Sequence, residues 1–299
     1  MWLLLAFLTA LLEAIAVHFD YLMINKYMTD YKAMFLVVSY CNFLVFIVIY
    51  LIKGSISAIP LITVILAILS GLIFAIGCYL FYKSFRMEEV SVVGAVVYIY
   101  IIFLAILNQI FKIGDNLNLL NIIGICLIVI SIFIFLIKDF KKLKLSKGVE
   151  VVILSAVVYS FSYFLIGLCM KQFNDSLVVY SYFRLGYAIG VFAFALIYLA
   201  EFKKTFKKFG MKTIYLQLIS NTLYIIAYLL LFFALASGKN VALVIAITAI
   251  YPFLVFLLAI ILSKTHPEIL KENLSRSIFI KKAIAIFILV IGIILVSSF

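Results

Sequence analysis

The chain has 299 residues, of which 68% are hydrophobic and only 12% are charged. Soluble globular domains have about 25% charged residues, so this composition excludes a water-soluble protein and is typical of a chain that crosses a lipid bilayer several times. The net charge of +12 would suggest nucleic-acid binding in a soluble protein, but most lysines and arginines here fall in short loops beside apolar segments, where they set membrane topology. We therefore expect a lipid bilayer around the chain and no nucleic-acid partner.

Apolar segments of about 20 residues, the length that spans a bilayer as a helix, recur along the whole chain. They predict ten helices, at residues 2–24, 33–52, 61–83, 90–111, 118–137, 149–170, 177–200, 213–236, 241–263 and 279–297. Turn residues or charges separate them, as at Gly114-Asp115-Asn116, at Gly238-Lys239-Asn240, and in the charged segments 138–147, 203–208 and 264–276. The sequence therefore predicts an all-α integral membrane protein with ten transmembrane helices.

The two halves of the chain resemble each other when the sequence is shifted by about 150 residues. Matches recur in the fourth predicted helix of each half, pairing Val90, Ala95 and Tyr100 with Val241, Ala246 and Tyr251. Because five helices per half is an odd number, the second half would enter the membrane upside down, and equivalent loops should differ in basic content. The loop after the second helix has Lys53 alone, whereas its counterpart has five lysines between residues 203 and 212. We predict two inverted five-helix repeats, at residues 1–145 and 146–299.

The same charges predict how the chain is oriented. Loops after the odd-numbered predicted helices hold 19 of the 24 basic residues. The positive-inside rule places these loops in the cytoplasm, so both termini would lie on the opposite side of a cytoplasmic membrane that the chain crosses many times.

Two stretches carry a resemblance to a known family. Residues 232–262 read FFALASGKNVALVIAITAIYPFLVFLLAIIL, in which an Ala-Leu ends one helix, a short turn contains glycine, and the next helix has the central Pro252. The equivalent in the first half is KSFRMEEVSVVGAVVYIYIIFLAIL at 83–107, followed by Gly114-Asp115, and the seventh predicted helix contains Tyr182-Phe183-Arg184. With ten helices in two halves, the chain resembles the EamA-type permeases of the drug/metabolite transporter superfamily.

The resemblance implies a transporter with a central cavity between the two halves, lined mainly by predicted helices 1, 3, 4, 6, 8 and 9. It covers essentially the whole chain, and its motifs specify the fold better than the substrate. The family usually has Gly-Glu where this sequence has Gly114-Asp115, and a proline in the fourth helix where this sequence has isoleucine. Larger members of the family generally place both termini in the cytoplasm, which is the reverse of the orientation that the charges predict here.

Glu13 is the first candidate site residue, because it lies near the middle of the first apolar helix. An ionisable group in mid-membrane costs several kcal/mol unless it faces a cavity or a partner. Glu13 and Asp20 are seven residues apart and share one helix face. Glu13 could bind a cation or exchange a proton for substrate; the alternatives are a carboxylate that bonds neighbouring helices and, for Asp20, one that reaches the headgroups. Arg184 could bind a substrate carboxylate through both nitrogens, extend to the membrane surface, or pair with a carboxylate.

Polar and aromatic side chains inside the other helices complete the candidate set. Gln217, Asn221, Tyr224 and Tyr228 form one polar stripe on the eighth helix, which must face protein or water because lipid cannot satisfy it. The sixth helix offers Tyr159, Ser160 and Tyr163, with Ser160 near the repeat position of Glu13. Tyrosines that could form a cage for an amine are Tyr79, Tyr82, Tyr98, Tyr100 and Tyr251. Pro252 is the candidate hinge, since it interrupts the helical hydrogen bonds.

These features favour a secondary active transporter of a small polar metabolite, an amino acid or an organic cation, working by alternating access, with proton coupling as one option. The alternatives are a flippase for a lipid-linked head group and a non-transporting membrane scaffold. No nucleophile–base pair, metal-ligand spacing or GxxxxGK[ST] motif is visible, so we expect neither an enzyme nor a bound cofactor or metal. The expected partner is a small-molecule substrate, and the sequence leaves open whether the protein forms a homodimer.

Overall fold

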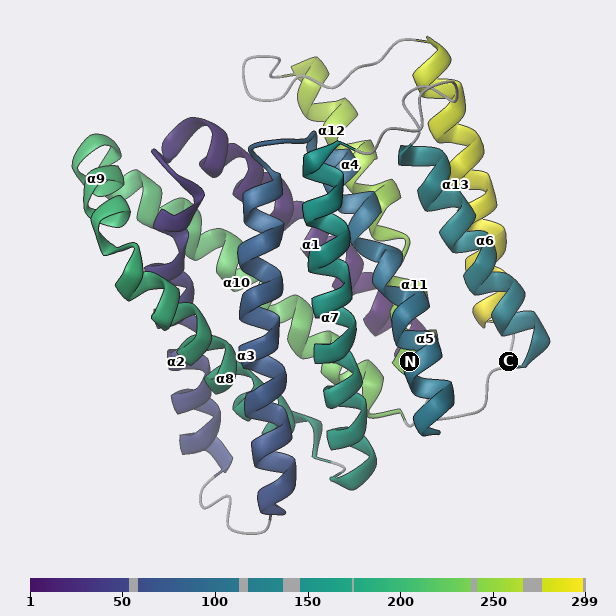
Figure 1. The fold of residues 1–299 in the computed structure, drawn as a ribbon, viewed down its shortest axis with the longest axis horizontal. Coiled ribbons are helices and arrows are strands. Elements are labelled where there is room, and N and C mark those ends of the chain that lie inside the picture. Colours follow the sequence, from purple (N-terminus) through teal and green to yellow (C-terminus); the bar gives the residue numbers. More distant parts are fainter. Residues whose placement is uncertain are drawn as a thin grey trace.

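The computed structural model describes residues 1–53, 59–112, 118–136, 146–173, 175–237, 241–265 and 276–297, and these residues form helices joined by short turns (Figure 1). The α-helices are α1 (Trp2–Leu22), α2 (Phe35–Lys53), α3 (Leu61–Ser84), α4 (Val90–Val96), α5 (Tyr100–Phe111), α6 (Leu119–Leu136), α7 (Lys147–Gln172), α8 (Ser176–Ile197), α9 (Leu199–Phe209), α10 (Met211–Leu235), α11 (Val241–Thr248), α12 (Tyr251–Thr265) and α13 (Arg276–Ser297). Short helices of other types are η1 (Met23–Tyr27), η2 (Tyr31–Met34) and η3 (Val97–Ile99). The turns predicted at 114–116 and 238–240, and most of the charged segments 138–147 and 264–276, lie outside the described residues.

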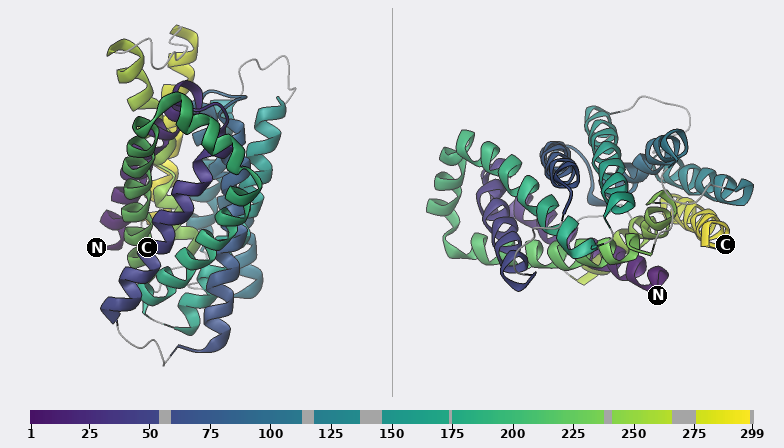
Figure 2. Two further views of the ribbon diagram at one scale, coloured as in Figure 1. Left: turned by 90° about the vertical axis from the view of Figure 1, so that its left-hand side faces the viewer. Right: turned by 90° about the horizontal axis from the view of Figure 1, so that it is seen from below.

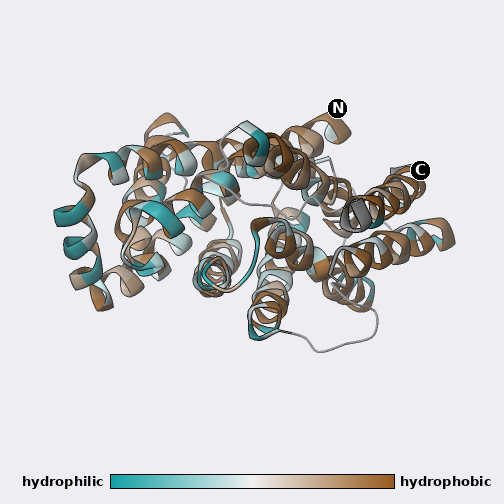
Figure 3. Ribbon diagram, turned by 90° about the horizontal axis from the view of Figure 1, so that it is seen from above, coloured by the Kyte–Doolittle hydropathy of each residue, from teal (hydrophilic) through white to brown (hydrophobic). Residues whose placement is uncertain are grey.

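The helix lengths are those of a multi-pass membrane protein. Within the described ranges, nine helical stretches are long and apolar enough to cross a membrane, and a shorter apolar stretch, Leu119–Ile134, lies within α6. The ribbon in Figure 3, coloured by hydropathy, has apolar residues along most helices and many hydrophilic residues on the left, where α9 lies. The predicted all-α class is confirmed, while the tenth span stays a prediction.

Two predicted single helices are interrupted. The segment at 90–111 is α4, the 3₁₀ turn η3 and α5, and the segment at 241–263 is α11 and α12 with a turn at Ala249 and Ile250. Pro252 lies in the first turn of α12, where its missing N–H leaves the helical ladder broken just before it. No proline accounts for the break at Val97–Ile99. The two breaks face each other at mid-bundle, where α4 packs against α12 and α5 against α11.

The charged segment after the seventh predicted span is not a loop. The prediction that a helix runs to residue 200 and is followed by a charged loop is wrong, since α8 ends at Ile197 and α9 covers Leu199–Phe209. Phe202, Phe206 and Phe209 recur on one side of α9 at three- and four-residue steps, so the segment is an amphipathic helix. It lies near one end of the bundle (Figure 2).

We call this end the basic end, defined by Arg86, Lys147 and Lys212. Arg86 donates to the Met28 carbonyl oxygen (3.0 Å), and Lys212 donates to the Tyr27 hydroxyl (3.1 Å), so the turns after α1 and α3 meet the start of α10 here. Glu88 accepts a hydrogen bond from Ser146 at the start of α7. The ends of several helices are therefore tied together at one side of the bundle.

The close approach of α3 to α8 fixes the centre of the bundle. A Cβ added at Gly186 would lie 2.1 Å from the Ile68 carbonyl oxygen, and one added at Gly71 would lie 2.2 Å from the Phe183 carbonyl oxygen. Gly186 and Gly190 are four residues apart, the spacing at which small residues let membrane helices approach backbone to backbone. This contact brings the face of α8 that contains Phe183, Gly186 and Tyr187 beside α3, while α1 packs along α10 and α3 also packs along α7 (Figure 1).

We predict that Gly186→Ala lowers the thermal stability of the purified protein. A methyl group 2.1 Å from a backbone oxygen cannot be accommodated by rotating a side chain, so the helices must separate. Overpacking of this kind costs about 1–3 kcal/mol or more, and the apparent Tm should fall by several degrees. Ile189→Ala is the matched control, because Ile189 is on the same helix with 48% of its side chain exposed. Equal melting temperatures for the two variants would show that the crossing is not tight.

Candidate functional site

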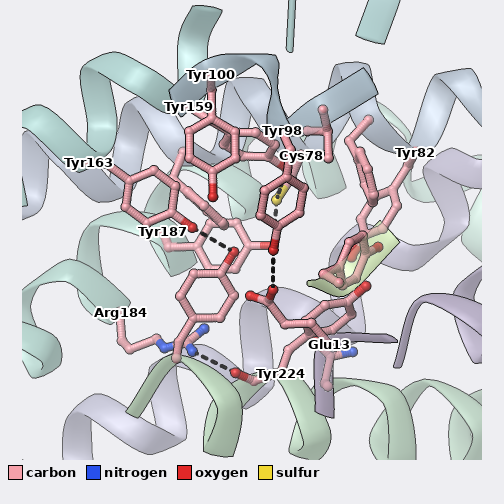
Figure 4. Close-up of a pocket in the computed structure, with 16 residues that line it drawn as sticks. Glu13, Cys78, Tyr82, Tyr98, Tyr100, Tyr159, Tyr163, Arg184, Tyr187 and Tyr224 are labelled. Carbon is pink, nitrogen blue, oxygen red and sulfur yellow. Dashed lines mark hydrogen bonds between the residues drawn. The ribbon is translucent and has the colours of Figure 1, made fainter. Parts of the chain in front are cut away.

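A cavity with no more than about 680 Å³ of empty space lies among α1, α3, the two interrupted spans, α7, α8 and α10. Tyrosines make up nine of its 16 lining residues: Tyr82, Tyr98, Tyr100, Tyr159, Tyr163, Tyr187, Tyr224, Tyr228 and Tyr251. The other residues include one acidic side chain, Glu13, and one basic side chain, Arg184 (Figure 4). The volume suits a small molecule rather than a lipid or a peptide.

Glu13 extends from the middle of α1 toward the aromatic groups. Its side chain is 9% exposed, and Tyr98 of η3 donates its hydroxyl to Glu13 Oε2 at 3.4 Å (Figure 4). The hydroxyl of Tyr228 on α10 also interacts with this carboxyl, and the charge of Arg184 acts on it. The sequence expectation that Glu13 faces a cavity rather than lipid agrees with this position.

Arg184 is held by three kinds of contact. Its Nη1 donates to the Asn42 Oδ1 at 2.7 Å, and its Nη2 donates to the Tyr224 carbonyl oxygen at 3.2 Å. The guanidinium carbon lies 4.7 Å from the ring centre of Tyr180 and 5.1 Å from that of Tyr228, which are cation–π contacts. The side chain is 2% exposed, which argues against the alternative in which it extends to the membrane surface. Its Nε has no hydrogen-bond partner among the described residues.

The two charges of the cavity are not neutralised by contact. Glu13 and Arg184 form no ion pair with each other or with another described residue. A buried charge without a partner costs free energy, and opposite charges that remain apart inside one cavity leave both able to bind an occupant. The arrangement can therefore bind a cationic group at Glu13 and an anionic group at Arg184.

Tyrosine contacts fix the walls around these charges. The rings of Tyr98 and Tyr251, which come from the two interrupted spans, are stacked with centroids 5.2 Å apart. Tyr100 and Tyr163 are stacked at the same centroid distance. Tyr163 donates its hydroxyl to that of Tyr228 at 3.2 Å, so the rings keep their polar ends toward the cavity. The result is a rigid aromatic wall whose hydroxyl groups can bind a polar occupant.

Eight of the eleven predicted site residues line the cavity: Glu13, Tyr98, Tyr159, Tyr163, Arg184, Asn221, Tyr224 and Tyr251. Pro252 follows Tyr251 directly and is buried at the break between α11 and α12. The helices expected to line the cavity all do so, and α8 contributes Arg184 and Tyr187 in addition. Whether these residues bind a substrate stays a prediction.

Three predicted site residues lie elsewhere. Tyr79 of α3 does not line the cavity, and its ring stacks on Phe194 of α8 with centroids 5.1 Å apart. Ser160 donates its hydroxyl to the Val157 carbonyl oxygen of its own helix at 2.6 Å. Gln217 is buried one turn away from the cavity residue Asn221. Ser160 differs from prediction because a helix rotates by about 100° per residue, so its neighbour Tyr159 faces the cavity instead. Gln217 shares the face of Asn221 but lies beyond the end of the cavity.

Sequence analysis missed several lining residues on α3 and α8. Phe74, Cys78 and Phe81 of α3 follow one another at four- and three-residue steps, and Tyr187 comes three residues after Arg184. The helical spacing from an already chosen residue would have identified Tyr187. Cys78 accepts hydrogen bonds from Tyr159 and Tyr187 at 3.2 Å each. This role could not be predicted from the sequence, because a cysteine within an apolar segment is typical of a packed core residue. In the part of the chain that is described, no three His, Cys, Asp or Glu side chains are grouped to hold a metal ion.

No family model and no curated protein matches the chain. Sixteen solved chains are similar to it. One of them, described as "Crystal structure of protein", is 16% identical, aligns over 99% of this chain and 96% of its own, and has a TM-score of 0.61. A likeness at this identity establishes the fold alone.

We predict that Asn42→Leu destabilises the protein, because the Arg184 guanidinium loses its shortest hydrogen bond to a buried partner. A hydrogen bond to a charged group contributes about 1.5–3 kcal/mol, so thermal unfolding should show a lower Tm. Asn42→Asp is the control of similar size: it keeps an oxygen acceptor and should be at least as stable as the parent. A Tm for Asn42→Leu equal to that of the parent would contradict the role given to Asn42.

Proposed function

We propose that the protein is a secondary active transporter of the drug/metabolite type, which moves a small polar solute across the cytoplasmic membrane through the tyrosine-lined cavity. The observation that carries the proposal is the presence of Glu13 and Arg184 in one cavity without an ion pair between them. A non-transporting scaffold would not require two buried charged residues that form no ion pair with each other. An amino acid, with an ammonium and a carboxylate group, is the class of solute that matches both.

The pairing of helices supports an arrangement of two inverted halves. Exchanging the predicted halves maps the first span onto the sixth and the third onto the eighth, so contacts of α1 with α10 should be mirrored by contacts of α3 with α7, as they are. The self-paired contacts of α2 with α8 and of α6 with α13 fit the same exchange. Both interrupted spans occupy the fourth position of a half. Tyr100 and Tyr251, matched by sequence, are the first residues of α5 and α12.

The interrupted spans also support alternating access. Interrupted helices in corresponding positions of the two halves are a common feature of transporter binding sites, because free backbone groups and bending are both available there. Here Tyr98 and Tyr251 lie at the two breaks, beside Glu13. Rocking of one half against the other about these breaks would expose the cavity first to one side of the membrane and then to the other.

The two charged residues should recognise the two ends of the solute separately. We predict that at least one of the twenty protein amino acids raises the Tm of the purified parent, as a bound ligand does by mass action. Its amide, which lacks the carboxylate, and its deaminated acid, which lacks the ammonium, should bind about 10–100-fold more weakly, the loss expected for one hydrogen bond to a charged group.

Variants extend the same test. Glu13→Gln should bind the amino acid as weakly as the parent protein binds the deaminated acid. Arg184→Lys, which keeps the charge but loses the forked geometry, should bind the amino acid about tenfold more weakly than the parent. Ser160→Ala is the control, because its hydroxyl bonds its own helix outside the cavity. Uptake of the stabilising amino acid into proteoliposomes completes the measurement. Unchanged binding and uptake in Glu13→Gln, or the absence of any stabilising solute, would contradict the proposal.

A further inference from the structure

The interface between α1 and α10 is polar on one side of the cavity. Along α10, Thr213, Gln217, Ser220 and Asn221 recur at three- and four-residue steps and share one helix face, and each is at most 5% exposed. That face meets α1, since the Ser220 hydroxyl donates to Asp20 Oδ1 at 2.5 Å. We call these four residues of α10, together with Asp20 of α1, the α1–α10 seam. It runs from the cavity residue Asn221 toward the basic end, where α10 begins.

Asp20 connects the seam with the cavity. It is 0% exposed and lies seven residues, about 10 Å along the helix axis, from Glu13. Besides Ser220, the side chains of Tyr82 and Tyr224 lie close to its carboxyl, whose Oδ2 has no hydrogen-bond partner among the described residues, and both tyrosines line the cavity. Asp20 is therefore the second buried carboxyl on the cavity face of α1.

Ionisable side chains from four other helices lie around Asp20: Cys78 and Tyr82 from α3, Tyr187 from α8, Tyr224 from α10 and Tyr251 from α12. His18 lies two residues before Asp20 on α1 itself, where its Nδ1 is 2.7 Å from the Ala14 carbonyl oxygen. Tyr224 and Tyr251 are at the same time neighbours of Glu13. Tyrosine hydroxyls therefore lie between the two carboxyls, and a hydroxyl can both accept and donate a proton.

Between Asp20 and the basic end, the seam contains buried polar atoms that have no hydrogen-bond partner among the described residues. They are Gln217 Oε1 and Nε2 and Thr213 Oγ1, on two side chains that are only 1% and 2% exposed. Buried polar atoms within a membrane helix are costly unless water or a transported ion reaches them. The exposed Lys212 follows at the basic end, where it contacts Tyr27.

The same interface is apolar toward the other end of the bundle. Ala227, Leu231 and Leu235 of α10 and Ala6 of α1 are buried there, at 2% exposure or less. The one hydroxyl, that of Thr9, bonds backbone oxygens of Leu5 and Ala227. A polar route from the cavity therefore exists along α1 and α10 in one direction only.

We propose that the α1–α10 seam transfers protons between Glu13 and the basic end, with Asp20 as the intermediate proton carrier. This inference rests on the proposed function. In the transfer, the Glu13 carboxylic acid gives its proton to the Tyr224 hydroxyl oxygen, directly or through one water molecule, while that hydroxyl gives its own proton to the Asp20 carboxylate. Glu13 becomes a carboxylate, Asp20 becomes a carboxylic acid and Tyr224 is unchanged. Asp20 then releases the proton to water beside Gln217 and Thr213.

The first test measures whether water reaches the seam. Single cysteines are placed in a background without the four native cysteines, in protein that elutes as one species and is reconstituted in lipid nanodiscs. Gln217→Cys and Thr213→Cys should react with methanethiosulfonate ethylammonium at least tenfold faster than two controls. Ile219→Cys lies on the exposed face of α10 (46%), and Leu231→Cys lies at the apolar end of the interface (2%). Equal rates at all four positions would overturn the inference.

The second test measures proton movement. Proteoliposomes that contain a pH-sensitive dye are mixed with the twenty protein amino acids. Asp20→Asn should slow the proton movement at least tenfold while stabilisation of the protein by the same mixture stays within twofold of the parent, and Asp20→Glu should restore part of the rate. If Asp20 had a purely structural role, Asp20→Asn would not slow proton movement while leaving stabilisation unchanged. Loss of stabilisation in Asp20→Asn would assign Asp20 to the solute site instead.

The two levels of the proposal fail in different ways. Solute uptake by the parent without proton movement, or unchanged proton movement in Asp20→Asn, overturns the seam and leaves the transport function intact. Absence of both uptake and stabilisation in the parent overturns the transport function. In that case the cysteine reactivities still decide whether the seam is hydrated.

Discussion

The cost of holding charge inside an apolar bundle governs the arrangement around Glu13 and Arg184. A charged group in a membrane interior persists only where hydrogen bonds, ring faces or water replace bulk solvent. Arg184 receives this support from Asn42, the Tyr224 carbonyl and aromatic rings, and Glu13 receives it from tyrosine hydroxyls. Because Glu13 and Arg184 form no ion pair with each other, the cavity contains two binding groups of opposite charge.

Tyrosine is the residue that makes such a centre compatible with a membrane helix. Its ring adds to the apolar packing between helices, while its hydroxyl supplies the polar contact that a buried charge requires. The nine cavity tyrosines come from six spans, so no single helix contains a long polar face. The close crossing of α3 and α8, which depends on Gly71 and Gly186, then brings these dispersed groups together.

Much of this centre could be predicted from the sequence, because a charge or a polar stripe in an apolar helix is visible without coordinates. Glu13, Arg184 and the stripe on α10 were identified in this way. Rotation about a helix axis was harder to predict: Ser160, near the repeat position of Glu13, was expected in the site, but Tyr159 and Tyr163 face the cavity and Ser160 bonds its own helix. The break at Val97–Ile99 could not be predicted from a proline, because there is none at that position. The helix α9 was not predicted because a lysine-rich segment between two apolar spans is typical of a loop.

The position of Ser160 also changes what the internal repeat means for function. If the halves were chemically equivalent, a carboxyl on α7 would face the one on α1, and two like charges would share the cavity. Tyrosines occupy that face of α7 instead, and the basic group enters from α8. Under the proposed function, two halves related by the predicted repeat could rock between two similar states, whereas a single acid and a single base would give the solute one orientation. The chemical asymmetry continues along α10, where the polar seam leads to one end of the bundle and apolar packing occupies the other. The proposed proton transfer uses this asymmetry, because only one of the two ends offers polar groups that lead away from the cavity.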